Sequence, residues 1–203
     1  KDTHKSDPIR ERIDSMTLQE RVGQLVIVGF DGYTADDSIK TMIQSYKVGG
    51  VILFGRNVEN PEQLITLNNT LKNINSGNKI PLFISIDEEG GKVSRMPKEI
   101  RKLPTNKTIG EANDENLSYE IGSILADEVK MFGFNINSNP QNPVIGDRSF
   151  GNSKEIVSRL GVQPMKGIQS GGVIPVVKHF PGHGDTSEDS HIGLPAVSHD
   201  MNR

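Results

Sequence analysis

The feature that most constrains the fold of this chain is an alternation of short apolar segments with amphipathic helical patterns. The apolar segments are hydrophobic at consecutive positions, as strands buried on both faces of a parallel sheet are. The segments that predict strands cover residues 24–28, 50–54, 82–87, 134–137 and 173–178. The helical patterns between them cover residues 36–46, 61–73, 115–132 and 153–170. Repeated strand-then-helix units indicate an α/β fold with a parallel sheet and outer helices.

Two short helices are predicted before the first strand. Asp7 precedes Pro8, which is typical of an N-cap followed by proline at the first helical position. Thr17 and Glu20 have the spacing of a capping box.

The positions of polar residues help to choose between a doubly wound sheet and a (β/α)8 TIM-type barrel. Asp87, Asn137 and the pair Lys178 and His179 each lie where a predicted strand ends. A barrel builds its active face from several strand ends, whereas an open sheet concentrates its site at one switch point. We therefore favour the barrel. A barrel has eight strands and about 250 residues, so the 203 residues and their five predicted strands indicate an incomplete barrel.

Composition excludes several classes of partner. A chain of 203 residues of which 33% are apolar can bury a core. The net charge of −3 comes from 23 basic and 26 acidic residues without a basic block, which does not favour nucleic acid as a ligand. No segment approaches the roughly 20 apolar residues that a membrane span needs, and no leader pattern opens the chain. The absence of cysteine excludes disulfides, thiolate metal sites and a cysteine nucleophile.

Titratable residues are concentrated in the segment VVKHFPGHGDTSEDSHIGLP, residues 176–195, which holds three of the five histidines. Its prolines and glycines forbid a regular helix, so His179 and His183 are not a helical metal-binding pair. Asp189 and His191 are two residues apart, close enough in a turn for the carboxylate to accept a hydrogen bond from the imidazole. Such a pair orients the ring and favours its charged form, which suits a general acid or base.

Two other interpretations of this segment stay open. Loop histidines can simply be solvated or cap the backbone of their own loop. A zinc site formed by His179, His183, Asp185 and His191 is permissible by residue type, although no helical spacing supports it.

The segment FISIDEEGGKVSRM, residues 83–96, predicts a second group of polar residues at a strand end. Asp87 lies at the rim of the predicted barrel, and Gly90 with Gly91 allows a tight turn near a ligand. Adjacent acids on a loop are usually solvated, so we expect Glu88 and Glu89 to face solvent.

A third segment, NPVIGDRSFG at residues 142–151, is a loop that carries Arg148. Its guanidinium could pair with Asp147 for structural reasons, or it could bind hydroxyl or carboxylate oxygens of a ligand. The residues alone leave both readings open.

Taken together, IDEEGGKVSR, NPVIGDRSFG and KHFPGHGDTSEDSH resemble the N-terminal barrel domain of glycoside hydrolase family 3. The resemblance begins at TLQERVGQLVIVGF, residues 17–30, and is strongest to the bacterial β-N-acetylglucosaminidases of cell-wall recycling. It implies that residues 1–203 are the N-terminal part of a catalytic barrel domain.

The resemblance also implies a retaining glycosidase that acts on N-acetylglucosamine-containing sugars or muropeptides, with no metal or organic cofactor. His191 would be the general acid/base and Asp189 its support. Asp87, Arg148, Lys178 and His179 would contact the hydroxyls of a terminal N-acetylglucosamine. Arg95 and His183 would be supporting contacts.

The nucleophile that the resemblance implies is an aspartate in a later segment, which we expect to lie outside the 203 residues. Two other functions therefore stay open, namely a non-hydrolytic sugar-binding or structural fragment and a phosphorolytic relative. A neutral histidine repels phosphate less than a carboxylate does, which would favour phosphorolysis. Oligomeric state and compartment stay open too, because relatives of this type occur in the cytoplasm and at the cell wall.

Overall fold

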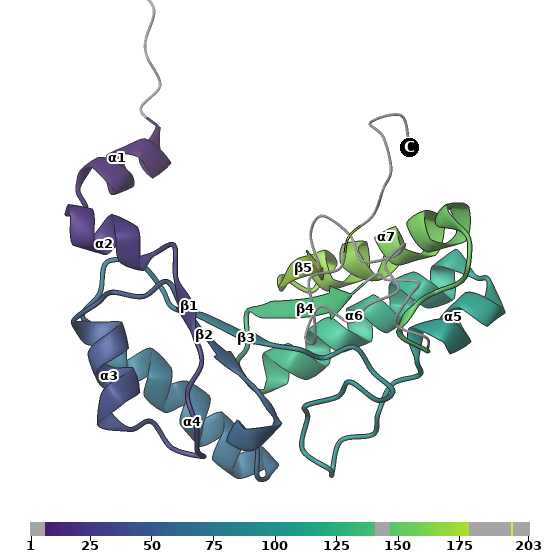
Figure 1. Cartoon of the computed structure of the whole chain (residues 1–203), viewed down its shortest axis with the longest axis horizontal. Coiled ribbons are helices and arrows are strands. Elements are labelled where there is room, and N and C mark those ends of the chain that lie inside the picture. The colour runs from purple at the N-terminus through teal and green to yellow at the C-terminus, as the bar shows by residue number, and fades with distance from the viewer. Residues whose placement is uncertain (1–6, 141–146, 179–195, 197–203) are drawn as a thin grey trace, which may run out of the picture. The chain divides into compact units, whose positions relative to one another are not determined.

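The computed structural model describes residues 7–140, 147–178 and 196, drawn in colour in Figure 1. The chain divides into two compact units, one that ends at Ser85 and one that begins at Ile86. Elements of the first unit are α1 Pro8–Asp14, α2 Leu18–Gly23, β1 Ile27–Val28, α3 Asp37–Gln44, β2 Gly50–Leu53, the 3-10 turn η1 Gly55–Asn57, α4 Pro61–Ile74 and β3 Phe83–Ile86, whose last residue crosses the boundary. Elements of the second unit are α5 Asn106–Ala112, α6 Glu115–Met131, β4 Ile136–Pro140, α7 Lys154–Ser170 and β5 Ile174–Lys178.

Parallel strand pairs joined through helices build each unit. In the first unit β1 pairs with β2 in register from Ile27 opposite Gly50, and the amide of Phe83 in β3 donates to the Gly49 carbonyl at 3.0 Å. In the second unit β4 pairs with β5 from Ile136 opposite Ile174 to Pro140 opposite Lys178. Parallel neighbours need a crossover connection, and α3, α4 and α7 supply it within the units. This confirms the α/β class predicted from the sequence.

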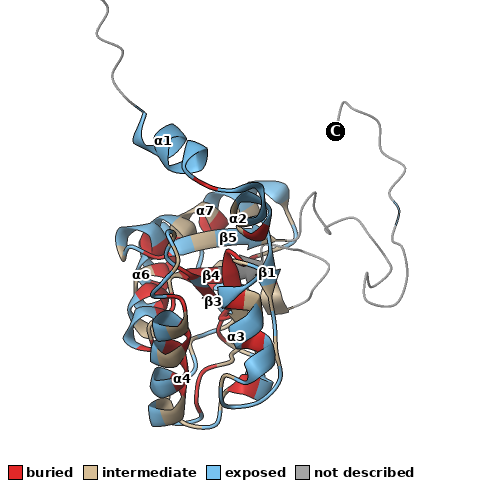
Figure 2. Ribbon diagram, turned by 90° about the vertical axis from the view of Figure 1, so that its left-hand side faces the viewer, coloured by how far each residue is buried: buried red, intermediate tan, exposed pale blue. Residues whose placement is uncertain are grey.

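The core of each unit lies between its sheet and its helices. Buried residues lie along α4 and α6, as Figure 2 shows. In the first unit Ile43, Leu53 and Leu64 are fully buried, and in the second Ala126 and Leu160 are.

Helices α6 and α7 lie side by side (Figure 1) and approach each other closely at two glycines. A Cβ atom on Gly122 would lie 2.3 Å from the carbonyl oxygen of Pro164, and one on Gly167 would lie 2.3 Å from that of Tyr119. The hydroxyl of Ser118 donates to the Leu160 carbonyl at 2.9 Å, so a buried polar group is paired across the same interface.

The structure confirms most of the predicted elements and corrects three. Asp7 caps α1, and the capping box of α2 is present. Strand β1 is shorter than predicted because residues 25 and 26 bond back to the end of α2. Strand β4 continues to Pro140, so Asn137 lies within the strand and not at its end. Helix α5 was not predicted, because its seven residues include Gly110 and carry only one buried apolar side chain, Ile109.

Among the helices in the described part of the chain, none is long and apolar enough to cross a membrane.

Candidate functional site

The candidate site begins where β3 ends, at three consecutive acidic residues. Side chains alternate between the two sides of an extended chain. Asp87 and Glu89 therefore point to one side, where both meet Lys178, and Glu88 points to the other.

Glu88 holds the loop that follows β3. Its side chain is 1% exposed, and its two oxygens accept the backbone amides of Gly90 at 3.1 Å and Arg95 at 2.8 Å. The side-chain amide of Asn137 fixes the backbone of Glu88, accepting from its N–H at 3.0 Å and donating to its carbonyl at 2.9 Å. Burial raises the pKa of Glu88, and the surrounding hydrogen bonds oppose that rise.

The two glycines make the tight turn that the sequence predicted. Gly90 and Gly91 have φ angles of 77° and 57°, in the left-handed region that glycine tolerates best. A Cβ atom on Gly90 would lie 2.6 Å from the carbonyl oxygen of Pro104. The turn is closed by a hydrogen bond of 3.2 Å from the amide of Val93 to the Gly90 carbonyl, and the amide of Gly91 joins it to the Leu103 carbonyl at 2.8 Å.

Four charged side chains form a connected network in the second unit. Lys178, the last residue of β5, places its Nζ 2.8 Å from Asp87 Oδ1 and 3.7 Å from Glu89 Oε1. Arg148 binds Glu89 in a bidentate manner, through Nε to Oε2 and Nη2 to Oε1, each at 2.8 Å.

The four side chains of this network differ in how far they are exposed to solvent. The Glu89 side chain is 2% exposed, whereas those of Asp87, Lys178 and Arg148 are 18%, 17% and 26% exposed. Glu89 is thus the buried member of the network, whereas the other three side chains are partly exposed to solvent. Burial raises the pKa of Glu89, while Arg148 and Lys178 limit that rise. Both oxygens of Glu89 accept from the guanidinium of Arg148, and this positive charge favours the ionised carboxylate.

Asp147 and the backbone of Arg148 make contacts separate from the network. Asp147 lies 3.3 Å from Lys92 Nζ and 3.7 Å from Lys107 Nζ. The side-chain amide of Asn106, at the start of α5, donates to the Arg148 carbonyl at 2.9 Å. The partner of Arg148 is therefore Glu89, and the suggested pairing with Asp147 was wrong.

The structure brings together three of the predicted sugar-binding residues: Asp87, Arg148 and Lys178. Arg95 is half-buried, and its backbone amide donates a hydrogen bond to Glu88. His179, His183, Asp189 and His191 lie outside the described residues, as does Asp185 of the zinc alternative. In the described ranges, no group of three or more histidine or acidic side chains could hold a metal ion.

Sequence reasoning missed the two buried acids. Glu88 and Glu89 were expected to be solvated, but they are 1% and 4% exposed. Glu89 follows Asp87 by two residues at a strand end, so the period of two along a strand was a signal that the pair shares a side.

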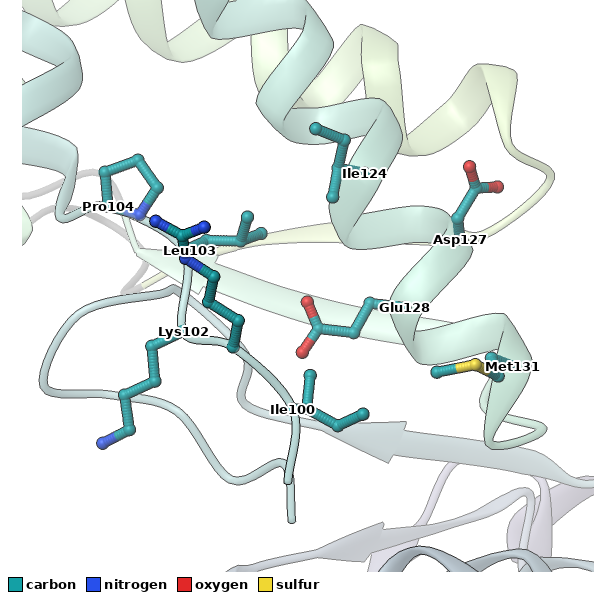
Figure 3. Close-up of a pocket in the computed structure, with 9 residues that line it drawn as sticks. Ile100, Lys102, Leu103, Pro104, Ile124, Asp127, Glu128 and Met131 are labelled. Atoms are coloured by element: carbon teal, nitrogen blue, oxygen red, sulfur yellow. The ribbon is translucent and has the colours of Figure 1, made fainter. Parts of the chain in front are cut away.

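The second unit also has a depression along α6, which none of the four network residues lines. It has a volume of about 790 Å³ and is lined by residues 100–104 and by α6 from Ile124 to Met131 (Figure 3). The carboxyl group of Glu128 points into it, toward Ile100 (Figure 3). Burial, with a smaller effect from the charge of Glu88, raises the pKa of Glu128 to about 7. None of the predicted site residues lines this depression, so its size does not make it the candidate site.

A parallel α/β fold with polar side chains gathered beyond its strands is characteristic of barrel domains. Residues 17–203 match the model of the Glycosyl hydrolase family 3 N terminal domain, and the chain belongs to this family. Its fold is accordingly the (β/α)8 type, of which the described residues supply five strands.

Curated relatives are named for one activity. A β-hexosaminidase A of Pseudoalteromonas piscicida is 39% identical over 93% of this chain and 36% of the relative. A β-hexosaminidase of Nitrosomonas eutropha is 38% identical over 79% of this chain and 49% of the relative. The chain thus spans between about a third and a half of the length of these relatives.

Solved structures are similar to this chain as well. A glycoside hydrolase family 3 β-N-acetylglucosaminidase from Paenibacillus sp. str. FPU-7 superposes with a TM-score of 0.86 at 43% identity, over 92% of this chain and 37% of that one. NagZ from Neisseria gonorrhoeae, solved in complex with N-trifluoroacetyl-D-glucosamine, gives a TM-score of 0.77 at 32% identity, over 87% of this chain and 55% of that one.

Proposed function

We propose that this chain is the N-terminal part of the catalytic barrel of a retaining β-N-acetylglucosaminidase. It would remove terminal N-acetylglucosamine from peptidoglycan-derived muropeptides or related glycosides. The observation that carries the proposal is the network of Asp87, Lys178 and Arg148 around the buried Glu89. The names of the relatives support the same activity.

The network has the chemistry that a sugar subsite needs. Sugar hydroxyls both donate and accept hydrogen bonds, and the three part-exposed side chains offer one acceptor, Asp87, and two donors, Lys178 and Arg148. In the proposal His179, the residue that follows β5 in the sequence, adds to this set, and Arg95 and His183 support it.

Catalysis in the proposal divides between two groups. A carboxylate nucleophile, which we place outside these 203 residues, attacks the anomeric carbon as the glycosidic bond breaks. His191, oriented by Asp189, gives a proton to the leaving oxygen. In the second step His191 takes a proton from water, whose oxygen releases the sugar from the nucleophile. This is double displacement with an imidazole in place of the usual acid/base carboxyl group.

The test is hydrolysis of an aryl N-acetyl-β-glucosaminide and of a muropeptide, together with the intact mass of the protein used. From a preparation whose mass exceeds that of these 203 residues, and which therefore includes the nucleophile, we expect release of N-acetylglucosamine from both substrates. A preparation with the mass of these 203 residues that binds N-acetylglucosamine without cleaving either substrate would support a sugar-binding fragment instead.

Phosphorolysis is separated from hydrolysis by the product. The same reactions are run with and without inorganic phosphate, and the products are resolved by chromatography. Hydrolysis gives free N-acetylglucosamine under both conditions, whereas a phosphate-dependent sugar 1-phosphate would assign the phosphorolytic reaction.

A further inference from the structure

The charges of the network Asp87, Glu89, Arg148 and Lys178 cancel. Two carboxylates face two cations, and the distances of 2.8 Å within each main pair are those of charge-assisted hydrogen bonds. A polar network of this kind can hold cations in place without a net charge in the subsite.

Arg148 keeps donors to spare while its charge is offset. A guanidinium has five N–H donors, and Glu89 takes up one on Nε and one on Nη2. The remaining three have no partner among the described residues. An unpaired guanidinium binds carboxylates and phosphates strongly. A guanidinium already paired with a carboxylate is better suited to neutral acceptors such as hydroxyl and amide oxygens.

Lys178 is held in the same way by two acids. Its ammonium lies 2.8 Å from Asp87 and 3.7 Å from Glu89. Among the described residues, Glu89 is therefore the one that contacts both cations, and at 2% side-chain exposure it is not itself available to a ligand.

We propose that Glu89 determines specificity by making the subsite select an uncharged sugar and reject an acidic one. It is a positioning residue, since it acts through Arg148 and Lys178 and does not touch the ligand. The inference rests on the proposed function, because it requires these two cations to face the sugar.

The test measures binding of N-acetylglucosamine by calorimetry, with and without sulfate, at an ionic strength kept constant with chloride. In the wild-type protein we expect sulfate not to compete with the sugar. In Glu89→Gln, which removes one negative charge at nearly constant volume, we expect sulfate to compete and to raise the apparent Kd of the sugar several-fold. We also expect sugar binding without sulfate to weaken by about tenfold, because Arg148 loses half of its bidentate partner.

Two further variants separate charge from structure. Asp147→Asn removes the same charge beside Arg148, but Asp147 pairs with Lys92 and Lys107, so sulfate should still not compete. Glu89→Asp keeps the charge and shortens the side chain, so it should weaken sugar binding while sulfate remains excluded. Thermal denaturation establishes that each variant is folded.

Competition by sulfate in the wild-type protein would overturn the inference, and that measurement needs no variant. The inference also fails if Glu89→Gln excludes sulfate as the wild type does, or if Asp147→Asn admits sulfate equally. Absence of N-acetylglucosamine binding by the wild-type protein would overturn the proposed function and this inference with it. Sugar binding accompanied by sulfate competition would overturn only the inference.

Discussion

Three glutamates of the second unit are buried or half-buried, and they differ in the partners that stabilise their negative charge. Glu88 has backbone donors and Glu89 has Arg148. In the described part of the chain Glu128 has neither a hydrogen bond nor an ion pair, and its surroundings include the apolar side chains of Ile100 and Leu103 (Figure 3). A half-buried carboxyl group without a partner favours its neutral form.

Replacement of Glu128 by glutamine should make the protein more stable in a pH-dependent way. Because the pKa of Glu128 is raised from 4.5 to about 7 on folding, the folded state binds more protons between these values. The favourable effect of the protonated form is complete below pH 4.5 and is lost as the pH rises through 7. Glu128→Gln should therefore match the wild type near pH 4.5 and exceed it at pH 8, by roughly 1 kcal/mol after allowance for solvent screening. Urea denaturation at the two pH values measures this difference.

The control for this prediction is Glu120→Gln, an exposed position on the same helix. It should change the free energy of unfolding by little at either pH. Equal stability of Glu128→Gln and the wild type at pH 8 would contradict the explanation given for the Glu128 pKa.

At the scale of elements, the most extensive contact between helices in the described part of the second unit is between α6 and α7. Two glycines, Gly122 and Gly167, allow the helix backbones to approach within the distance that a side chain would otherwise occupy. Glycine in the interior of a helix is normally unfavourable by about 0.5–1 kcal/mol relative to alanine. Its presence at both contact points is explained by this approach.

Gly122→Ala should therefore destabilise the protein, although the same change in an exposed helix would stabilise it. The added methyl group would lie 2.3 Å from the Pro164 carbonyl oxygen, so one helix must move. Overpacking of this kind costs about 1–3 kcal/mol, which thermal denaturation would detect as a lower Tm. Gly77→Ala is the matched control, because a Cβ there meets nothing within 4 Å and should leave the Tm unchanged or slightly higher. A Tm for Gly122→Ala equal to that of Gly77→Ala would mean that the helices separate without cost.

The elements themselves follow closely from local sequence signals. Caps such as Asp7 and the Thr17–Glu20 box mark helix starts by chemistry that operates within a few residues. Strand β3 begins one residue after its predicted start, and all of its residues except Phe83 are buried. Helix α5 does have a cap, since the Thr105 hydroxyl accepts from the Thr108 amide at 3.2 Å, but its seven residues carry a single buried apolar side chain, Ile109, and therefore show no apolar period.

At the scale of the whole molecule, the candidate site was predictable in part because it is assembled from strand ends. The positions of Asp87, Arg148 and Lys178 followed from sequence motifs, and these three residues do converge. The depth of Glu88 and Glu89 did not follow, because it depends on Asn137 and Arg148, which lie 49 and 59 residues further along the chain. The sequence around two adjacent acids therefore cannot predict their burial when the residues that bury them lie far along the chain.

The separate roles proposed for the network of Asp87, Glu89, Arg148 and Lys178 and for His191 lead to a prediction about catalysis. Proton donation matters most when the leaving oxygen is basic and little when it is already a stable anion. In the protein that carries the complete barrel with its nucleophile, His191→Ala should therefore slow hydrolysis of a muropeptide by about 10²–10⁴-fold, and slow hydrolysis of an activated nitrophenyl glycoside far less. The KM for the activated substrate should change little, because the network around Glu89 is untouched. Steady-state kinetics on both substrates measures this, with Glu120→Gln, at an exposed position on α6, as a control that should behave as the wild type does. An equal loss on both substrates would mean that His191 does not donate a proton, and the acid/base would then have to be sought among other side chains.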